Sequence, residues 1–306
     1  MSRYIIRRLL SSVVTFIGAS IAVFILMRLV PGDPALMVLP EGATLEEMNR
    51  VRELMGLDKP MWAQYLDFVG DALRGDFGDS FQHAAPALDV VVERLPKSIY
   101  LGATALLITV VIGVPIGILA AVRRGSWFDF LASLTAILSQ STPSFWLGLM
   151  LIFAFSLGLR WFPVAGSQTW KHVVLPAVTL AVYPISLVLR LTRTSFLEVL
   201  GADYIRTAEA KGLRGTAVLL KHALKNAAIP VVTVLCLQIA GILAGAVVVE
   251  NVFSWPGIGM TVIAAVNLRD YPILQVALLL SSAAFITVNL VADLLYAVLD
   301  PRIRYG

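Results

Sequence analysis

Six long stretches of the sequence are almost free of charged side chains, and this pattern constrains the fold more than any other feature. The stretches are Leu9–Val30, Ile99–Val122, Phe130–Leu159, His172–Leu189, Asn226–Val249 and Tyr271–Leu299. Only the first and the last contain an ionisable Asp, Glu, Lys or Arg, namely Arg28 and Asp293. A helix of about 20 apolar residues crosses the roughly 30 Å of bilayer hydrocarbon, and a backbone in lipid must satisfy its own hydrogen bonds. The sequence therefore predicts an all-α integral membrane protein with six transmembrane helices.

The composition argues against a soluble protein with an unusually large core. Of the 306 residues, 58% are hydrophobic and 14% are charged, whereas soluble domains carry about 25% charged residues. The single cysteine, Cys236, excludes an internal disulfide and a cysteine-based zinc cluster. The three histidines, His83, His172 and His222, are too scattered to suggest a metal site. We therefore expect neither a metal nor a cofactor in this chain.

Lys and Arg residues are distributed unequally between the two sides of the predicted membrane helices. With the N-terminus inside, six crossings return the C-terminus inside, and the inner segments hold 14 of the 24 Lys and Arg residues. The positive-inside rule therefore places both termini in the cytoplasm. This asymmetry accounts for the net charge of +4 without a nucleic-acid partner. The basic N-terminus resembles a signal peptide, but its apolar run is long and residues 28–31 form a poor cleavage site, so we expect a retained first helix.

Residues 31–98 form the one sizeable polar segment, which the predicted orientation places outside the cytoplasm. Thr44 and Glu47 match a capping box, which predicts a helix ending before Gly56. A second amphipathic helix is expected near Met61–Leu73. This small helical segment is predicted to lie at the mouth of the pore, either as a docking surface for a soluble partner or as a structural cap. We divide the chain accordingly into residues 1–30, residues 31–98 and a core of residues 99–306.

The longest inner loop, residues 190–225, is too polar to span the membrane. On helical spacing, an apolar face is predicted for Phe196, Val199, Leu200, Tyr204 and Ala208. Gly212 is expected to end this short helix with a positive φ angle. Such a helix either couples to a moving partner or lies on lipid headgroups, and the spacing alone leaves both possibilities open.

Residues 206–212, Arg-Thr-Ala-Glu-Ala-Lys-Gly, with Ile229 and Pro230 downstream, resemble the EAA loop of ABC-importer permeases. The pattern departs from the family in that Pro230 directly follows Ile229 and that Glu209 stands where the peptide-importer branch commonly has Arg. Further matching motifs follow in order at residues 4–9, 31–34, 75–80, 94–96, 143–146, 255–259, 269–272 and 300–305. Together they are similar to the first permease of the pair in bacterial dipeptide, oligopeptide, glutathione and nickel importers.

This resemblance implies a multi-pass subunit of the bacterial inner membrane that forms half of a translocation pore. Its partners would be a second, homologous but non-identical permease, two cytoplasmic ATPase subunits that bind ATP and Mg²⁺, and an extracytoplasmic solute-binding protein. The resemblance assigns docking against the ATPase to Asp203, Tyr204, Arg206, Thr207, Ala208, Glu209, Ala210, Lys211 and Gly212. The chain has no G-x-x-x-x-G-K-[ST] loop to bind ATP phosphates, so hydrolysis is expected in a separate chain. Peptides are the leading solute, and nickel or another small solute is the alternative.

The rival functional classes are an ion-coupled secondary transporter and a passive channel. Ion-coupled transporters usually carry buried ionisable groups within the membrane, and Asp293, near the inner end of its span, is the one candidate. The polar side chains expected within the spans are Gln140, Gln238, Asn289 and Asp293. They either line a translocation path or a partner subunit, or make simple interhelical hydrogen bonds worth about 0.6 kcal/mol on average. Pro143 and Pro184 are either gating kinks or tolerated breaks in their spans, and we expect tolerated breaks.

Overall fold

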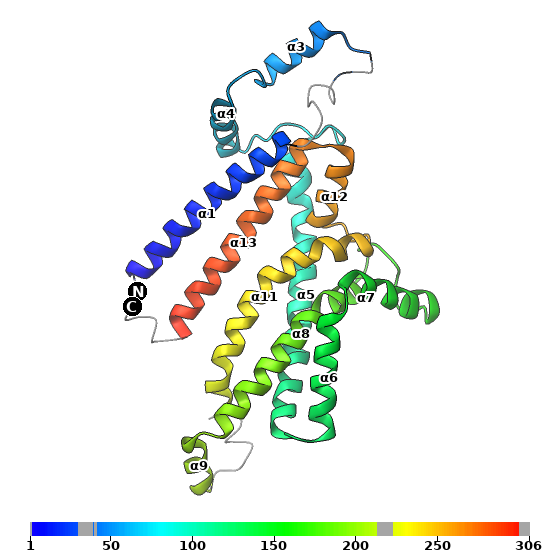
Figure 1. The fold of residues 1–306 in the computed structure, drawn as a ribbon. Coiled ribbons are helices and arrows are strands. Elements are labelled where there is room, and N and C mark those ends of the chain that lie inside the picture. The colour runs from blue at the N-terminus through cyan, green and yellow to red at the C-terminus, as the bar shows by residue number, and fades with distance from the viewer. Residues whose placement is uncertain (1, 30–38, 40–41, 213–222, 300–306) are drawn as a thin grey trace. The chain divides into compact units, whose positions relative to one another are not determined.

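The computed structural model describes residues 2–29, 39, 42–212 and 223–299, and these residues are almost entirely helical (Figure 1). Among them, β-type pairing is limited to an isolated bridge between Asp79 and Pro86. The helices are α1 (Ser2–Leu29), α3 (Leu45–Leu54), α4 (Met61–Arg74), α5 (Ala87–Val122), α6 (Trp127–Ser141), α7 (Ser144–Leu151), the π-helix η1 (Ile152–Gly158), α8 (Lys171–Leu200), α9 (Asp203–Ala210), α11 (Leu224–Val252), α12 (Ile258–Leu268) and α13 (Tyr271–Leu299). This helical content confirms the all-α prediction.

Within the described residues, five helices are long and apolar enough to cross a membrane, and a bent pair supplies a sixth candidate span. The five helical spans are Tyr4–Leu29, Ala87–Val122, Lys171–Leu200, Asn226–Val252 and Tyr271–Leu294. The bent pair joins Trp127–Ser141 to Ser144–Gly158. Each candidate span overlaps one of the predicted apolar stretches. These spans fit a multi-pass membrane protein, whereas the side of the membrane on which each terminus lies stays a prediction.

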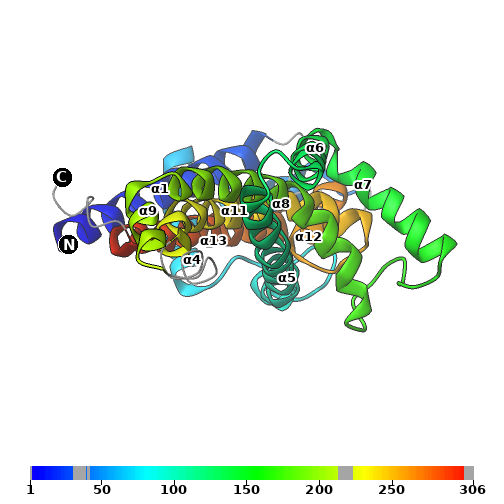
Figure 2. The same ribbon diagram turned by 90° about the horizontal axis from the view of Figure 1, so that it is seen from below.

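The third predicted stretch, Phe130–Leu159, is not one continuous helix, and this part of the prediction is wrong. The pair formed by α6 and α7–η1 is bent by 107°, and Figures 1 and 2 show α7 turning away from α6. Pro143 lacks a backbone N–H and disfavours helical geometry in the residue before it. Thr142 accordingly adopts an extended conformation, with φ −89° and ψ 120°. The break expected at Pro143 is present, since α6 ends at Ser141 and α7 begins at Ser144, and whether it serves in gating stays a prediction.

Several helix boundaries also differ from the apolar stretches. Helix α5 begins at Ala87 rather than Ile99, and α8 continues to Leu200 rather than ending at Leu189. Hydropathy misses both extensions because their residues include charged side chains. Helix α12 was not predicted, since its 11 residues are too few to cross a bilayer.

The chain divides into two compact units, which are described separately. Unit 1 comprises Met1–Arg8, Ile99–Trp255 and Thr287–Gly306, and unit 2 comprises Leu9–Ser98 and Pro256–Ile286. The partition follows internal packing, so it does not test the predicted division at residues 30 and 98, which stays a prediction.

Unit 2 confirms the two helices predicted between the first spans. Thr44 and Glu47 form the predicted capping box, in which the Glu47 carboxylate accepts a 2.8 Å hydrogen bond from the Thr44 backbone N–H. Helix α4 follows Pro60 as expected, and the Arg28 Nε donates to its Gln64 Oε1 at 2.9 Å. The charged end of α1 is therefore paired with a polar side chain of α4. The core of this unit includes Met27, Ala87, Val91, Ile258, Ala265, Ile273, Leu274, Val276 and Ala277.

Unit 1 is built on close packing of α5 against α8. Gly113 and Gly117, one turn apart on α5, face α8 without side chains of their own. An added Cβ at Gly117 would lie 2.7 Å from both the Leu189 carbonyl oxygen and the Thr192 Cβ. The two backbones therefore approach closely because glycine occupies this contact. Helix α11 completes the core of this unit through residues that include Ile242, Ala246, Val249 and Phe253.

Candidate functional site

The predicted coupling segment contains helix α9, which follows α8 in unit 1 (Figure 1). Ile205 of α9 is 1% exposed. It belongs to a buried cluster with Ala121, Phe196, Ala223 and Ala227, which come from α5, α8 and the start of α11. Ile205 therefore anchors α9 to the ends of three longer helices.

The remaining described side chains of α9 face away from this cluster. Asp203, Thr207 and Ala210 are exposed, as is Tyr204, at 42%. The Tyr204 hydroxyl accepts a 2.9 Å hydrogen bond from the Asn226 Nδ2, which ties α9 to α11 a second time. The predicted coupling residues Arg206, Ala208 and Glu209 belong to α9, but their side chains lie outside the described residues. Helix α9 is thus fixed on one side and open to solvent on the other.

The single amphipathic helix predicted from Phe196 to Ala208 is divided in the structure, and this prediction is wrong. Phe196 and Leu200 belong to α8, whereas Tyr204 and Ala208 belong to α9. The chain turns at Gly201 and Ala202, where the Ala202 backbone N–H donates to the Val199 carbonyl at 3.0 Å. The apolar face therefore does not run continuously through this segment.

The end of α9 agrees with the sequence prediction. Gly212 has a φ angle of +79°, a left-handed conformation that penalises a side chain with a β-carbon. Lys211 and Gly212 follow the helix and are exposed. The predicted role of Gly212 as a helix stop is therefore confirmed, and its role in coupling stays a prediction.

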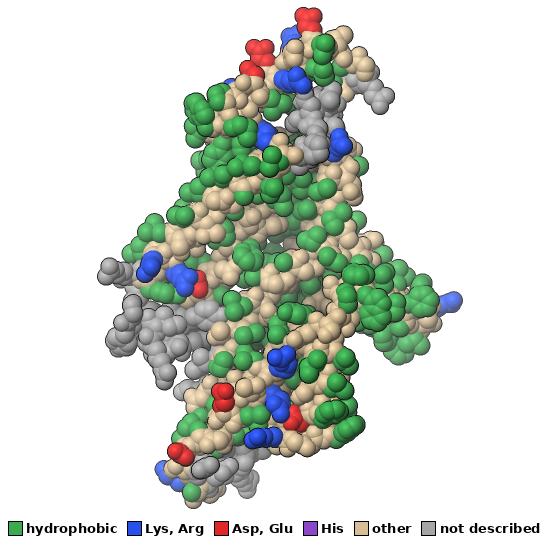
Figure 3. All heavy atoms as spheres, viewed as in Figure 1, with side chains coloured by type: hydrophobic (Ala, Val, Ile, Leu, Met, Phe, Trp, Pro, Cys, Tyr) green, Lys and Arg blue, Asp and Glu red, His purple; other side chains and the backbone are tan. Residues whose placement is uncertain are grey.

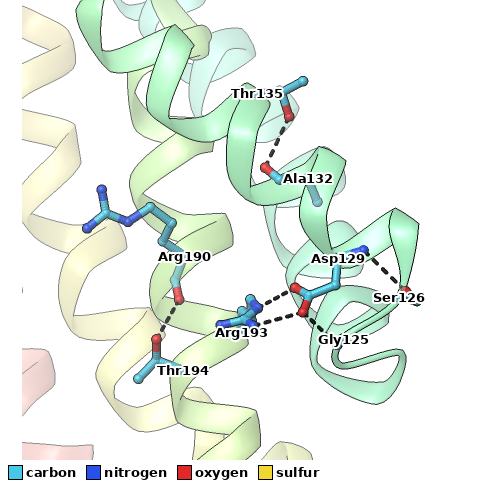
Figure 4. Close-up of polar contacts among 8 residues, drawn as sticks. All are labelled: Gly125, Ser126, Asp129, Ala132, Thr135, Arg190, Arg193 and Thr194. Atoms are coloured by element: carbon cyan, nitrogen blue, oxygen red, sulfur yellow. Dashed lines mark hydrogen bonds and ion pairs between the residues drawn. The ribbon is translucent and has the colours of Figure 1, made fainter.

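An ion pair joins α6 to α8 in unit 1 (Figure 4). The Arg193 Nε donates to the Asp129 Oδ1 at 2.5 Å, and the Arg193 Nη2 donates to the Asp129 Oδ2 at 2.8 Å. The Asp129 side chain is 7% exposed and that of Arg193 is 27% exposed. Two parallel hydrogen bonds of this kind fix both the distance and the orientation of the two groups.

Asp129 is also held by the turn that precedes α6. The Gly125 backbone N–H donates to the Asp129 Oδ2 at 3.0 Å, and the Ser126 hydroxyl accepts from the Asp129 backbone N–H at 3.3 Å (Figure 4). A carboxylate in the first turn of a helix also interacts favourably with the helix dipole. Asp129 therefore joins the α5–α6 turn to Arg193, two turns before the end of α8. Figure 3 shows charged side chains gathered over this region, whereas hydrophobic side chains cover α7 and η1.

Sequence reasoning missed this ion pair, since the two residues are 64 positions apart. The available signal was local: Ser126 followed three residues later by Asp129 is an N-cap pattern. Nothing in that pattern indicates which basic residue approaches the carboxylate.

The four polar residues predicted within the spans do not form one cluster. The Gln140 Oε1 accepts a 3.2 Å hydrogen bond from Arg190 Nη1, and the Gln140 Nε2 is buried without a partner among the described residues. The Asp293 Oδ2 forms an ion pair with Arg8 Nη1 at 2.9 Å. Gln238 and Asn289 are half-buried. The structure thus gives Gln140 and Asp293 partners within the chain, and whether any of the four residues lines a path stays a prediction.

Comparison with known proteins gives matches over almost the whole chain. Residues 113–305 match the family described as binding-protein-dependent transport system inner membrane component, and residues 1–102 match its N-terminal family. The chain is 42% identical over 305 residues to the glutathione transport system permease protein GsiC of Escherichia coli strain K12, with 100% of both chains covered. The same identity and coverage hold for the protein of that name from Shigella dysenteriae serotype 1.

Two solved structures share the fold at low sequence identity. The MetNI methionine ABC transporter in inward-facing conformations has a TM-score of 0.58 at 17% identity, with 69% of this chain and 96% of that chain covered. An amino acid ABC transporter solved with histidines has a TM-score of 0.52 at 15% identity, with 68% of this chain and 94% of that chain covered. These matches show the fold, and the relatives of higher identity show the family.

Proposed function

Since the chain belongs to the family of binding-protein-dependent transport system inner membrane components and is a transport permease, we propose that it forms half of the pore of a glutathione or short-peptide importer. The full-length identity to permeases named for glutathione transport supports this solute class. Energy would come from ATP hydrolysed in partner chains, as in other ABC importers.

The observation that carries the coupling role is the geometry of α9. Ile205 is buried against the ends of α5, α8 and α11, whereas Asp203, Tyr204 and Thr207 are exposed. A helix held in this way transfers a displacement of its open face to the helices behind it. We assign that open face, within residues 203–212, to docking against a cytoplasmic ATPase subunit.

The proposed assembly has a second homologous permease, two ATPase subunits that bind ATP and Mg²⁺, and a solute-binding protein. Residues 99–306 would form the pore core in the bacterial inner membrane, with the coupling loop at residues 190–225. Both termini would be cytoplasmic, and residues 31–98 would lie on the outer side, where the binding protein docks.

Uptake by the reconstituted assembly tests this function. Liposomes containing the chain with its co-purified partners are loaded with ATP, and labelled glutathione and a labelled dipeptide are supplied with the binding protein outside. We expect uptake that requires both ATP and the binding protein. Uptake driven by an ion gradient without ATP would contradict the proposal, and uptake of Ni²⁺ without either peptide would exclude the solute class.

Labelling of single cysteines tests the orientation. Cys236 is first replaced by Ser, and Gln82→Cys and Arg124→Cys are made separately, since both positions are exposed. We expect an impermeant thiol reagent added to intact spheroplasts to label position 82 and to leave position 124 unlabelled until the cells are broken. The reverse pattern would place the coupling loop outside and overturn the docking assignment.

A further inference from the structure

Unit 2 contains a cavity of about 210 Å³ that the proposed function leaves unused. It lies among residues 83–94, α12 and the start of α13. Its lining includes apolar side chains such as Val90, Leu268 and Ile273. Against this apolar surface stand two side chains of opposite charge, Arg94 and Asp270.

Arg94 lies on α5 and is half-buried. Within the part of the chain that the structure describes, it makes no hydrogen bond or ion pair, and it does not pair with Asp270. A guanidinium group has five N–H donors arranged for a planar anion such as a carboxylate. The cavity therefore presents a cation whose donors have no partner among the described side chains.

Asp270 is 1% exposed and is held by three donors. The Ser80 hydroxyl and the Gln82 backbone N–H donate to its Oδ2 at 2.5 and 3.3 Å, and the Ile273 backbone N–H reaches its Oδ1 at 3.4 Å. A carboxylate has about four acceptor positions. Three donors therefore leave one acceptor position of Asp270 for a further donor.

Two residues with a left-handed backbone conformation are adjacent to the cavity-lining residues His83 and Asp270. Ala84 has a φ angle of 46° and Arg269 a φ angle of 54°, a left-handed conformation that is uncommon for residues other than glycine. Ala84 follows His83, whose Nδ1 lies 3.1 Å from the Ser80 hydroxyl, and Arg269 precedes Asp270. The left-handed conformation of Arg269 caps the C-terminus of α12 and places Asp270 directly after that helix.

We propose that this cavity binds one free amino acid with an apolar side chain, in its zwitterionic form. The carboxylate pairs with Arg94, the ammonium group donates to the open position of Asp270, and the side chain contacts the apolar lining. A carboxylic acid without an ammonium group would leave Asp270 unpaired and bring a second negative charge close to it. An amine without a carboxylate would leave Arg94 unpaired and bring a second positive charge close to it. The volume lies below the roughly 300–1,000 Å³ of sites for drug-sized ligands, so it suits a single amino acid rather than a longer peptide.

Saturation-transfer NMR on the full chain in lipid nanodiscs tests the site, because this method detects weak binding. The probes are L-leucine, L-leucinamide, which lacks the carboxylate, and 4-methylpentanoate, which lacks the ammonium group. We expect signal from leucine and at least fivefold less from each analogue, after subtraction of empty nanodiscs. Arg94→Gln should reduce the leucine signal to the level of leucinamide and leave the leucinamide signal unchanged.

Two further variants separate binding from folding. Arg74→Gln removes an exposed cation of the same unit that is paired with Asp71 and lies outside the cavity lining, and it should leave the leucine signal unchanged. Ala264→Phe fills the cavity from α12 while keeping Arg94, and it should abolish the signal. Equal signals from leucine and leucinamide, or an undiminished leucine signal in Arg94→Gln, would overturn the site. These outcomes do not depend on whether the assembly transports peptides.

Discussion

Replacing Arg193 by Gln removes both hydrogen bonds to Asp129 and leaves a carboxylate that is only 7% exposed. Truncating one partner of a buried ion pair costs about 3–5 kcal/mol, and the Asp129 carboxylate would keep the Gly125 backbone N–H as its hydrogen-bond donor. The opposite change, Asp129→Asn, leaves Arg193, whose side chain is 27% exposed and can reach water. We therefore expect a loss of about 3–5 kcal/mol for Arg193→Gln, against about 1.5–3 kcal/mol for Asp129→Asn, the typical worth of a hydrogen bond to a charged group.

Reversible unfolding in mixed micelles with increasing SDS measures these differences. Arg190→Gln is the matched control, since Arg190 is exposed and its side chain donates to Gln140 at 3.2 Å. It should cost less than about 1 kcal/mol, because contacts of charged groups that are open to solvent contribute little. The double variant at residues 129 and 193 should be less destabilised than the sum of the single variants, because contacting residues couple by about 0.5–3 kcal/mol. Equal losses for the two single variants, or a loss for Arg193→Gln no larger than that of the control, would refute the reasoning.

Three further predictions concern packing and coupling in unit 1. Gly117→Ala should destabilise the chain by about 1–3 kcal/mol through overpacking. Gly18→Ala should not, since no atom lies within 4 Å of its added Cβ. The same unfolding assay compares the two variants, and equal free energies of unfolding would contradict close packing at residue 117. Ile205→Ser should detach α9 and lower ATP-driven uptake severalfold in the reconstituted assembly. Tyr204→Phe, which removes one hydrogen bond, should lower uptake less. Equal effects of the two variants on uptake would contradict anchoring through the buried Ile205 side chain. Gly212→Val should reduce solute-stimulated ATP hydrolysis and uptake together at normal complex yield, and unchanged coupled uptake would contradict the docking assignment.

Hydropathy located the membrane helices well because a span must be apolar over its whole length. Helix α13 has the predicted bounds, and α11 extends the predicted stretch by a few residues at each end. The capping box at Thr44 and the positive φ angle of Gly212 were also predicted correctly. Both depend on local backbone chemistry, in which a short stretch of sequence contains all the interacting groups.

The errors arose where distant residues decide the local structure. The apolar stretch ended before Arg190, yet α8 continues to Leu200, and Arg193 in this extension is paired with Asp129 of another helix. Pro143 marked the site of a possible break, but the bend of 107° cannot be read from the sequence. Proline ends the hydrogen-bond pattern of a helix, while packing around it sets the angle of the next segment.

The contacts along α8 follow one another without a gap toward α9. Gly113 and Gly117 of α5 contact α8 between Ile185 and Thr192, and Arg193 is paired with α6 in the next turn. Phe196 then packs with Ile205 of α9 in a cluster that also includes residues of α5 and α11. Because packed helices and paired charges resist deformation, we infer that α5, α6 and α8 move as one body when α9 is displaced.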